Sequence, residues 1–134
     1  GFQVEYVWRA KAATSSFGSP VAHNDLAWFV NRSGVVYCLD LKSGEEKYAR
    51  RTASSIWATP LIIGDRLYLF GKDGTTSILH ASADSEILAE NSLWVNEPAG
   101  DQTGSFGSPV LYAASAADST LILRRGDRLF AIRR

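Results

Sequence analysis

The chain has 134 residues, 46% hydrophobic and 21% charged, which is typical of one folded globular domain and not of a disordered segment. Fourteen basic residues balance fourteen acidic ones, so no net positive field favours nucleic-acid binding. No apolar run approaches the roughly 20 residues of a membrane helix, and the single cysteine, Cys38, excludes an internal disulfide and a multi-cysteine zinc site. We therefore expect neither a nucleic-acid partner nor membrane insertion.

The sequence repeats itself every forty residues. Residues Ser19–Gly34 align without a gap with Thr59–Gly74, and the same shift brings Trp8, Tyr48 and Leu88 to one position of the repeat. Self-similarity at a fixed period of this length is the signature of a repeat architecture. The chain is therefore predicted to consist of copies of one structural unit.

A third copy opens at residues 105–110, which are identical to residues 16–21. About four extra residues follow within 113–118, before the repeat resumes at Leu121–Leu123.

Each unit is predicted to form β-strands separated by tight turns. Apolar and aromatic runs favour strands, and the dipeptides Asn24-Asp25 and Gly64-Asp65 tolerate the positive φ that hairpin turns require. The expected strands are residues 4–9, 20–23, 26–30, 35–39, 46–50, 61–63, 67–70, a fourth strand of the second unit within 84–95, and strands at 121–123 and 129–132.

Several of these strands are apolar on both faces, so both faces must be covered. Four antiparallel strands in forty residues, covered on both sides, describe the blade of a β-propeller. The expected fold is an all-β propeller segment of about three four-stranded antiparallel blades, in the strand pattern D-ABCD-ABCD-ABC. Its units are residues 1–12, which supply the last strand of a preceding blade, then 13–52, 53–98 and 105–134.

Three blades are too few to close a ring, since propellers have about four or more. Either the chain is a piece of a longer protein, which is the favoured interpretation, or two chains form a homodimer that completes a six-bladed ring. In that homodimer each chain would donate its first strand to the last blade of the other.

Residues 38–48 resemble the tryptophan-docking motif A-x-D-x-x-T/S-G-x-x-x-W of the pyrroloquinoline-quinone-like (PQQ-like) propeller repeat. Asp40, Ser43 and Gly44 match the motif, whereas Cys38 replaces its Ala and Tyr48 its Trp. In such a turn Asp and Ser bond backbone N–H groups, Gly takes the left-handed conformation, and the aromatic ring packs on the adjacent blade.

The second repeat departs from this motif. His80 stands in place of Asp, Asp84 in place of Gly and Leu88 in place of Trp. A different turn and looser docking are expected there.

Non-enzymatic members of the family that the chain resembles act as scaffolds, for example in outer-membrane protein assembly, or as binding modules. The resemblance thus implies a scaffold or binding module for a protein or a small anionic ligand, without catalytic residues, metal or cofactor. It also implies a periplasmic or otherwise extracytoplasmic bacterial setting.

The alternative is a fragment of a quinone-dependent alcohol or sugar dehydrogenase, which would use PQQ with calcium. The resemblance gives that branch an adjacent-cysteine disulfide in many members, which a chain with one cysteine cannot form. Glu97 and Asp101 would be the carboxylates available to calcium, although two carboxylates in a loop are more often simply solvated.

One repeated pattern predicts a binding site. Arg32, Lys72 and Arg125 are expected in the turn between the second and third strands of successive units, on the face where aromatic residues precede each first strand. A repeated cation beside a repeated aromatic side chain would bind an anionic ligand or an acidic peptide. The plainer interpretation is that turns are polar and that the aromatic rings pack between blades. The aromatic residues are Phe17, Trp57 and Phe106.

Overall fold

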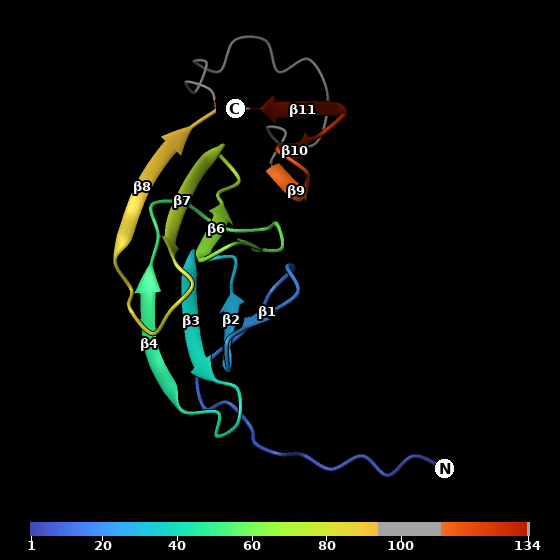
Figure 1. Cartoon of the computed structure of the whole chain (residues 1–134), viewed down its shortest axis with the longest axis vertical. Helices are drawn as coiled ribbons and strands as arrows, with labels where there is room; N and C mark the ends of the chain where they lie inside the picture. Colours follow the sequence, from blue (N-terminus) through green and yellow to red (C-terminus); the bar gives the residue numbers. More distant parts are fainter. Residues whose placement is uncertain (94–110, 134) are drawn as a thin grey trace.

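The computed structural model describes residues 1–93 and 111–133, which form three antiparallel sheets and, within these ranges, no helix. The three sheets follow one another along the chain and fan out into an open arc (Figure 1). The first sheet has the order β1 (Val21–His23), β2 (Leu26–Val30), β3 (Val35–Asp40), β4 (Glu46–Arg51). The second has the order β5 (Leu61–Ile63), β6 (Arg66–Phe70), β7 (Thr75–His80), β8 (Ile87–Ser92).

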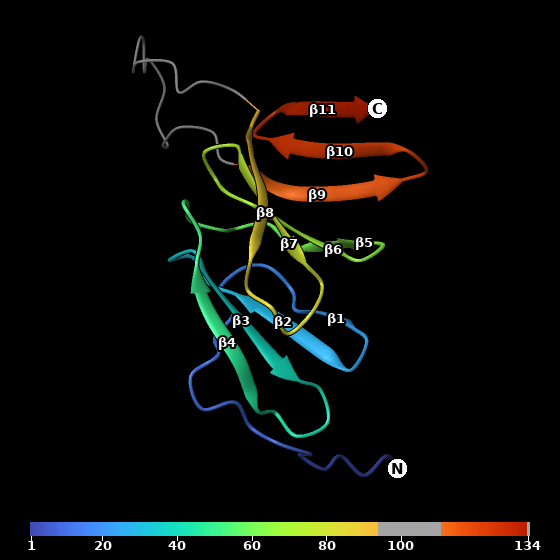
Figure 2. The same ribbon diagram turned by 60° about the vertical axis from the view of Figure 1, so that its left-hand side comes forward.

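The third sheet has three strands, in the order β11 (Arg128–Arg133), β10 (Thr120–Arg125), β9 (Leu111–Ala117). Figure 2 shows the sheets stacked one after another, with the first sheet nearest the N-terminus and the third at the opposite end. The first strands of neighbouring sheets contact each other, β1 with β5 and β5 with β9. The expectation of an all-β propeller segment with two complete blades and a three-stranded one is confirmed.

Tight turns fix the register of each hairpin. Asn24 and Asp25 both have positive φ, 46° and 61°, and they join β1 to β2 so that Val21 pairs with Trp28. Both residue types tolerate this conformation because their short polar side chains bond locally. Since the side chains of a strand alternate between faces, this register sends Trp28 and Val30 to the same side of the sheet.

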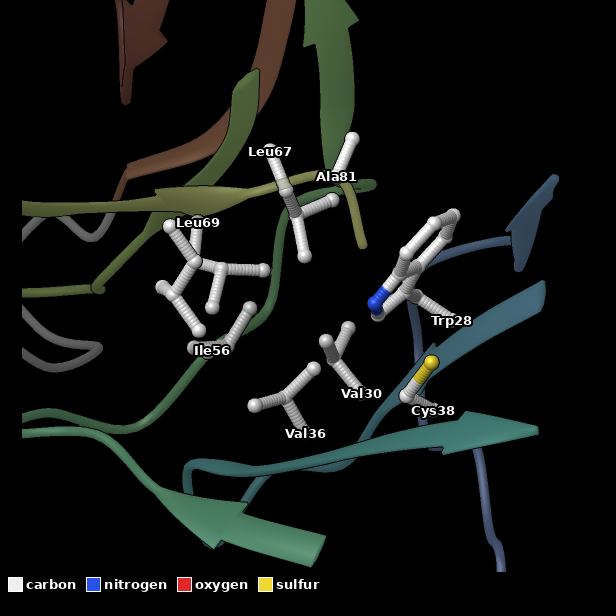
Figure 3. Packing of buried hydrophobic residues seen from close by; sticks show 9 residues of the cluster. Trp28, Val30, Val36, Cys38, Ile56, Leu67, Leu69 and Ala81 are labelled. Atoms are coloured by element: carbon white, nitrogen blue, oxygen red, sulfur yellow. The ribbon is translucent and has the colours of Figure 1, made fainter. Parts of the chain in front are cut away.

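The core lies between neighbouring sheets. On the first sheet Trp28, Val30 and Val36 are buried against Leu67 and other residues of the second sheet (Figure 3). The indole Nε1 of Trp28 donates a hydrogen bond of 2.8 Å to the Tyr48 hydroxyl, so its polar atom stays paired inside the core. Each fully buried apolar side chain of this size stabilises the fold by about 1.5–3 kcal/mol.

A second, smaller core joins the second and third sheets. It contains Ala58, Phe70, Leu111 and Leu123, all fully buried. Both cores therefore include residues of the second sheet, which is covered on its two faces by its neighbours.

The structure differs from the expected strands at two places. Residues 4–9 form no strand, because a strand needs a neighbour to pair with and no described strand of this chain lies beside them. The extra residues within 113–118 lengthen β9, which has seven residues where β1 and β5 have three.

Candidate ligand-binding rim

The turns after β2 and β6 place Arg32 and Lys72 at equivalent positions. Each turn closes with a backbone hydrogen bond, from Gly34 N to Asn31 O at 2.9 Å and from Gly74 N to Gly71 O at 3.0 Å. Both cationic side chains are exposed, and within the described residues neither takes part in an ion pair.

Each of these turns contacts the segment that leads into the first strand of its own sheet. The backbone N–H of Arg32 donates to the Ser16 hydroxyl at 3.0 Å, and that of Lys72 donates to the Ser55 carbonyl at 2.8 Å. Since Phe17 follows Ser16 directly, these bonds bring the cations and the aromatic residues to one rim of the arc.

The aromatic residues of neighbouring blades pack on each other. The ring centroids of Phe17 and Trp57 are 4.7 Å apart, with the planes tilted by 40°. The entry segments themselves lie in contact: Ser19 N donates to Thr59 Oγ1 at 3.0 Å, and a Cβ on Gly18 would come within 2.8 Å of the Ala58 carbonyl. The plainer interpretation of these rings as contacts between blades therefore holds for this pair, yet Phe17 remains 58% exposed.

A carboxylate accompanies Lys72 in its turn. Burial opposes ionisation of Asp73, but hydrogen bonds from Thr75 N–H and the Ser54 hydroxyl outweigh it and lower the pKa of the carboxyl. The corresponding residue of the first turn is Ser33, which carries no charge. The positive potential of the rim is therefore stronger beside Arg32 than beside Lys72.

The third unit does not place its cation, Arg125, in the turn that carries Arg32 and Lys72. Arg125 is half-buried, it is the last residue of β10 instead of a turn residue, and it pairs with Arg128 across a turn of only Gly126 and Asp127. The backbone N–H of Leu111, at the start of β9, donates to the Lys72 carbonyl at 3.1 Å. The expectation that Arg125 occupies the same turn as Arg32 is corrected by this shorter connection.

The other candidate residues of this segment, Phe106, Glu97 and Asp101, lie outside the described residues.

The turn that carries the family resemblance lies at the opposite end of the strands from this rim. Asp40 Oδ1 accepts hydrogen bonds from the backbone N–H groups of Ser43 and Lys42 and from the Ser43 hydroxyl, and these bonds lower the pKa of the Asp40 carboxyl. Trp8 lies against Gly44 of this turn, and its Nε1 donates to the Leu41 carbonyl at 2.8 Å.

Cys38, in the same strand as Asp40, offers no reactive thiol. It is fully buried, and burial raises the pKa of its thiol to about 11. The reactive thiolate is therefore scarce near neutral pH.

Sequence reasoning missed Ser16 and Ser55 as the residues that hold the rim together. The signal was present for Ser16, since it opens the six-residue stretch that recurs at Ser105. Within the two ranges that the structure covers, no group of three or more His, Cys, Asp or Glu side chains is close enough to hold a metal ion. No helix there is long and apolar enough to cross a membrane.

Solved structures of other proteins have a fold similar to that of this chain. No family model matches the sequence, and no curated protein matches it either. Among solved structures, BamB from Moraxella catarrhalis has 24% identity and a TM-score of 0.59, over 81% of this chain and 31% of BamB. The computationally designed Ika4 protein has 10% identity and a TM-score of 0.63, over 98% of this chain and 99% of Ika4.

The quinohemoprotein alcohol dehydrogenase from Comamonas testosteroni is a third similar structure. It has 15% identity and a TM-score of 0.61, over 85% of this chain and 18% of the dehydrogenase. The chain thus spans less than a third of BamB and less than a fifth of the dehydrogenase. These likenesses show a β-propeller fold.

Proposed function

We propose that the chain is a non-catalytic module of a PQQ-like propeller that acts as a scaffold by binding a protein partner through an acidic segment. The observation that carries this proposal is the rim on which exposed Arg32 and Lys72 flank the contact between Phe17 and Trp57. Cations bind carboxylates, and an exposed aromatic ring packs against the apolar parts of a peptide. A small anionic ligand would use the same chemistry at the same place.

BamB, at 24% identity, and the dehydrogenase, at 15%, share only the fold with this chain, so the scaffold proposal rests on the rim residues and not on the comparisons. The proposal includes an extracytoplasmic bacterial setting and a homodimer that completes a ring; the surface for this homodimer is argued in the next subsection.

Charge reversal at the rim tests the binding proposal. The probe is a fluorescein-labelled oligo-glutamate peptide, and its fluorescence anisotropy reports binding. We expect the wild-type chain to bind it at low ionic strength and to lose affinity as salt is added, because exposed charges are screened. The double variant Arg32→Glu/Lys72→Glu should weaken binding about tenfold or more.

A matched control reverses two cations at the other end of the strands. Lys42 and Arg66 are exposed and pair with Asp25 and Asp65 there, so Lys42→Glu/Arg66→Glu changes the net charge by the same amount. If both double variants weaken binding equally, the peptide senses only net charge and the rim is not the site. Binding that survives Arg32→Glu/Lys72→Glu would equally overturn the proposal.

A second candidate function is that of a quinone-dependent alcohol or sugar dehydrogenase, which the structural likeness to the Comamonas testosteroni enzyme favours. Within the described residues no cluster of three His, Cys, Asp or Glu side chains would hold the calcium that the resemblance implies, and the candidate carboxylates Glu97 and Asp101 lie outside these residues. The single cysteine cannot form an adjacent-cysteine disulfide.

Addition of PQQ and calcium separates the two candidates. We expect no saturable change in the visible absorbance of PQQ and no reduction of a redox dye with ethanol or glucose as electron donor. Saturable PQQ binding together with dye reduction would replace the scaffold proposal by the enzyme.

A further inference from the structure

We propose that the outer face of the third sheet and its edge strand β11 form the docking surface for a second copy of this chain, whose residues 4–9 add to β11 as a fourth strand. This inference deepens the homodimer of the proposed function, and it is independent of ligand binding at the rim. The outer face is defined by Ile122, Leu129 and Ala131, which lie on the side of β10 and β11 that faces away from the second sheet.

The register of the third sheet shows that this face is built like an interface between blades. Ile122 pairs with Ala131, as Trp28 pairs with Cys38 in the first sheet. Leu129 likewise takes the position that Val36 has in the first sheet. Trp28, Val36 and Cys38 are fully buried by the second sheet, whereas Leu129 is 71% and Ile122 38% exposed.

Among the described strands, none lies beside the outer edge of β11. In the first two sheets, a fourth strand pairs with the third, β4 with β3 and β8 with β7. Within the described residues β11 pairs only with β10. An open strand edge presents unpaired backbone groups and is a template for pairing with another chain.

The N-terminal segment has the character of the absent strand. Trp8 has the repeat position of Tyr48, which lies in β4. Val4 and Tyr6 are 86% and 77% exposed, although their apolar surface suits a strand.

Contacts of Trp8 place this segment next to the first sheet. Trp8 lies against Gly44 and donates to the Leu41 carbonyl, both in the turn that joins β3 to β4. Tyr48, its equivalent, packs against the core that joins the first sheet to the second. Residues 4–9 thus lie where the fourth strand of a preceding blade would lie, while the third sheet of the same chain is at the other end of the arc (Figure 2).

The strand inventory points to a second copy as the occupant. The described residues form eleven strands, and residues 4–9 have the repeat position of the strand that the third blade lacks among them. Two copies related by a twofold axis would exchange these segments and form six complete blades, within the range of about four to eight that closes a propeller.

The register of the first sheet predicts the pairing across the interface. Tyr48 pairs with Cys38 and Arg50 with Val36. Transferred to the dimer, Trp8 pairs with Ala131 of the partner copy, and the pairing continues one residue past the segment, with Ala10 opposite Leu129. Trp8 then faces the same side as Ala131, toward the first sheet of its own chain, where it already contacts Gly44.

The solution mass, measured by light scattering coupled to size exclusion, tests the proposal. We expect twice the chain mass of 14.6 kDa. Leu129→Asp should raise the dimer dissociation constant about tenfold or more, since it buries an unpaired carboxylate at the interface. Tyr6→Pro should do the same because proline cannot donate to a strand ladder. A monomeric wild-type chain overturns the proposal and leaves the outer face to a further blade of a longer chain.

Matched controls keep the result specific. Ile63→Asp changes an equally apolar residue that is exposed on the second sheet, and Phe2→Pro changes the N-terminus outside the predicted strand. Both variants should remain dimers. If Leu129→Asp and Tyr6→Pro also remain dimers, another surface joins the copies and the proposal fails. Circular dichroism checks that each variant retains its β-structure.

A disulfide test does not depend on destabilising variants. Ala10→Cys/Leu129→Cys should give a covalent dimer on a non-reducing gel after mild oxidation, whereas Ala10→Cys/Ile63→Cys should not. Native Cys38 does not interfere because it is fully buried. The absence of the covalent dimer contradicts the predicted register. All these readouts report mass, so failure of the dimer is distinguishable from failure of peptide binding at the rim.

Discussion

Gly44 satisfies two requirements that no other residue type satisfies together. Its φ is +72°, in the left-handed region, and a Cβ at this position would come within 2.6 Å of the Trp8 ring. Gly64, in the turn between β5 and β6, meets only the first requirement: its φ is +61° and nothing lies within 4 Å of its added Cβ. The two glycines therefore separate the cost of backbone conformation from the cost of displacing Trp8.

We predict that Gly44→Ala destabilises the chain more than Gly64→Ala. Each substitution should cost about 1–2 kcal/mol for placing a Cβ in the left-handed conformation. Gly44→Ala should cost more because it also pushes the indole of Trp8 away from the turn and breaks its hydrogen bond to Leu41. Urea unfolding followed by circular dichroism measures both free energies.

The control for this prediction is the Trp8→Ala background. Without the indole, the two glycine substitutions should cost the same free energy, since only the backbone requirement remains. A difference that persists in the Trp8→Ala background would show that Gly44 acts through some contact other than Trp8.

At the scale of elements, local sequence predicts most of the strands. Residues 26–30 are expected as a strand and form β2, and residues 46–50 fall within β4. These segments succeed because their apolar residues, and the turn residues that bound them, act within the hairpin itself. Segment 4–9 has the same local character and forms no strand, because strand formation requires a paired edge that the sequence of this segment does not supply.

In the candidate site, too, the positions within one repeat can be predicted from the sequence, whereas the contacts between blades depend on how the blades pack. The repeat predicts that Arg32 and Lys72 share a turn, because both turns have the same length and the same position in the forty-residue unit. The plainer interpretation of the sequence, that the aromatic rings pack between blades, holds for Phe17 and Trp57, but the 4.7 Å separation of their rings depends on how neighbouring blades approach. Arg125 does not occupy the equivalent turn, because the turn between β10 and β11 contains only Gly126 and Asp127. The length of such a turn depends on which residues of the two strands pair with each other.

At the scale of the whole molecule, the sheets form a linear array in which each contacts only its neighbours. The second sheet contributes to both cores, through Leu67 on one side and Phe70 on the other. The third sheet contributes Leu123 to the second core, which is the smaller one. In such arrays stability is approximately a sum of terms for each unit and each interface between neighbours.

This arrangement predicts how a core deletion spreads through the molecule. Leu67→Ala and Leu123→Ala each remove a fully buried side chain, at a cost of about 2–5 kcal/mol. In the Leu129→Asp background, which is expected to keep copies apart, Leu123→Ala should accelerate amide hydrogen exchange in β9–β11 and leave β1–β4 slow. Leu67→Ala should accelerate exchange in the first and second sheets together, because it weakens the interface that they share. Equal acceleration in all three sheets by both variants would mean that the chain unfolds as one cooperative unit, and stability would then not divide by interface.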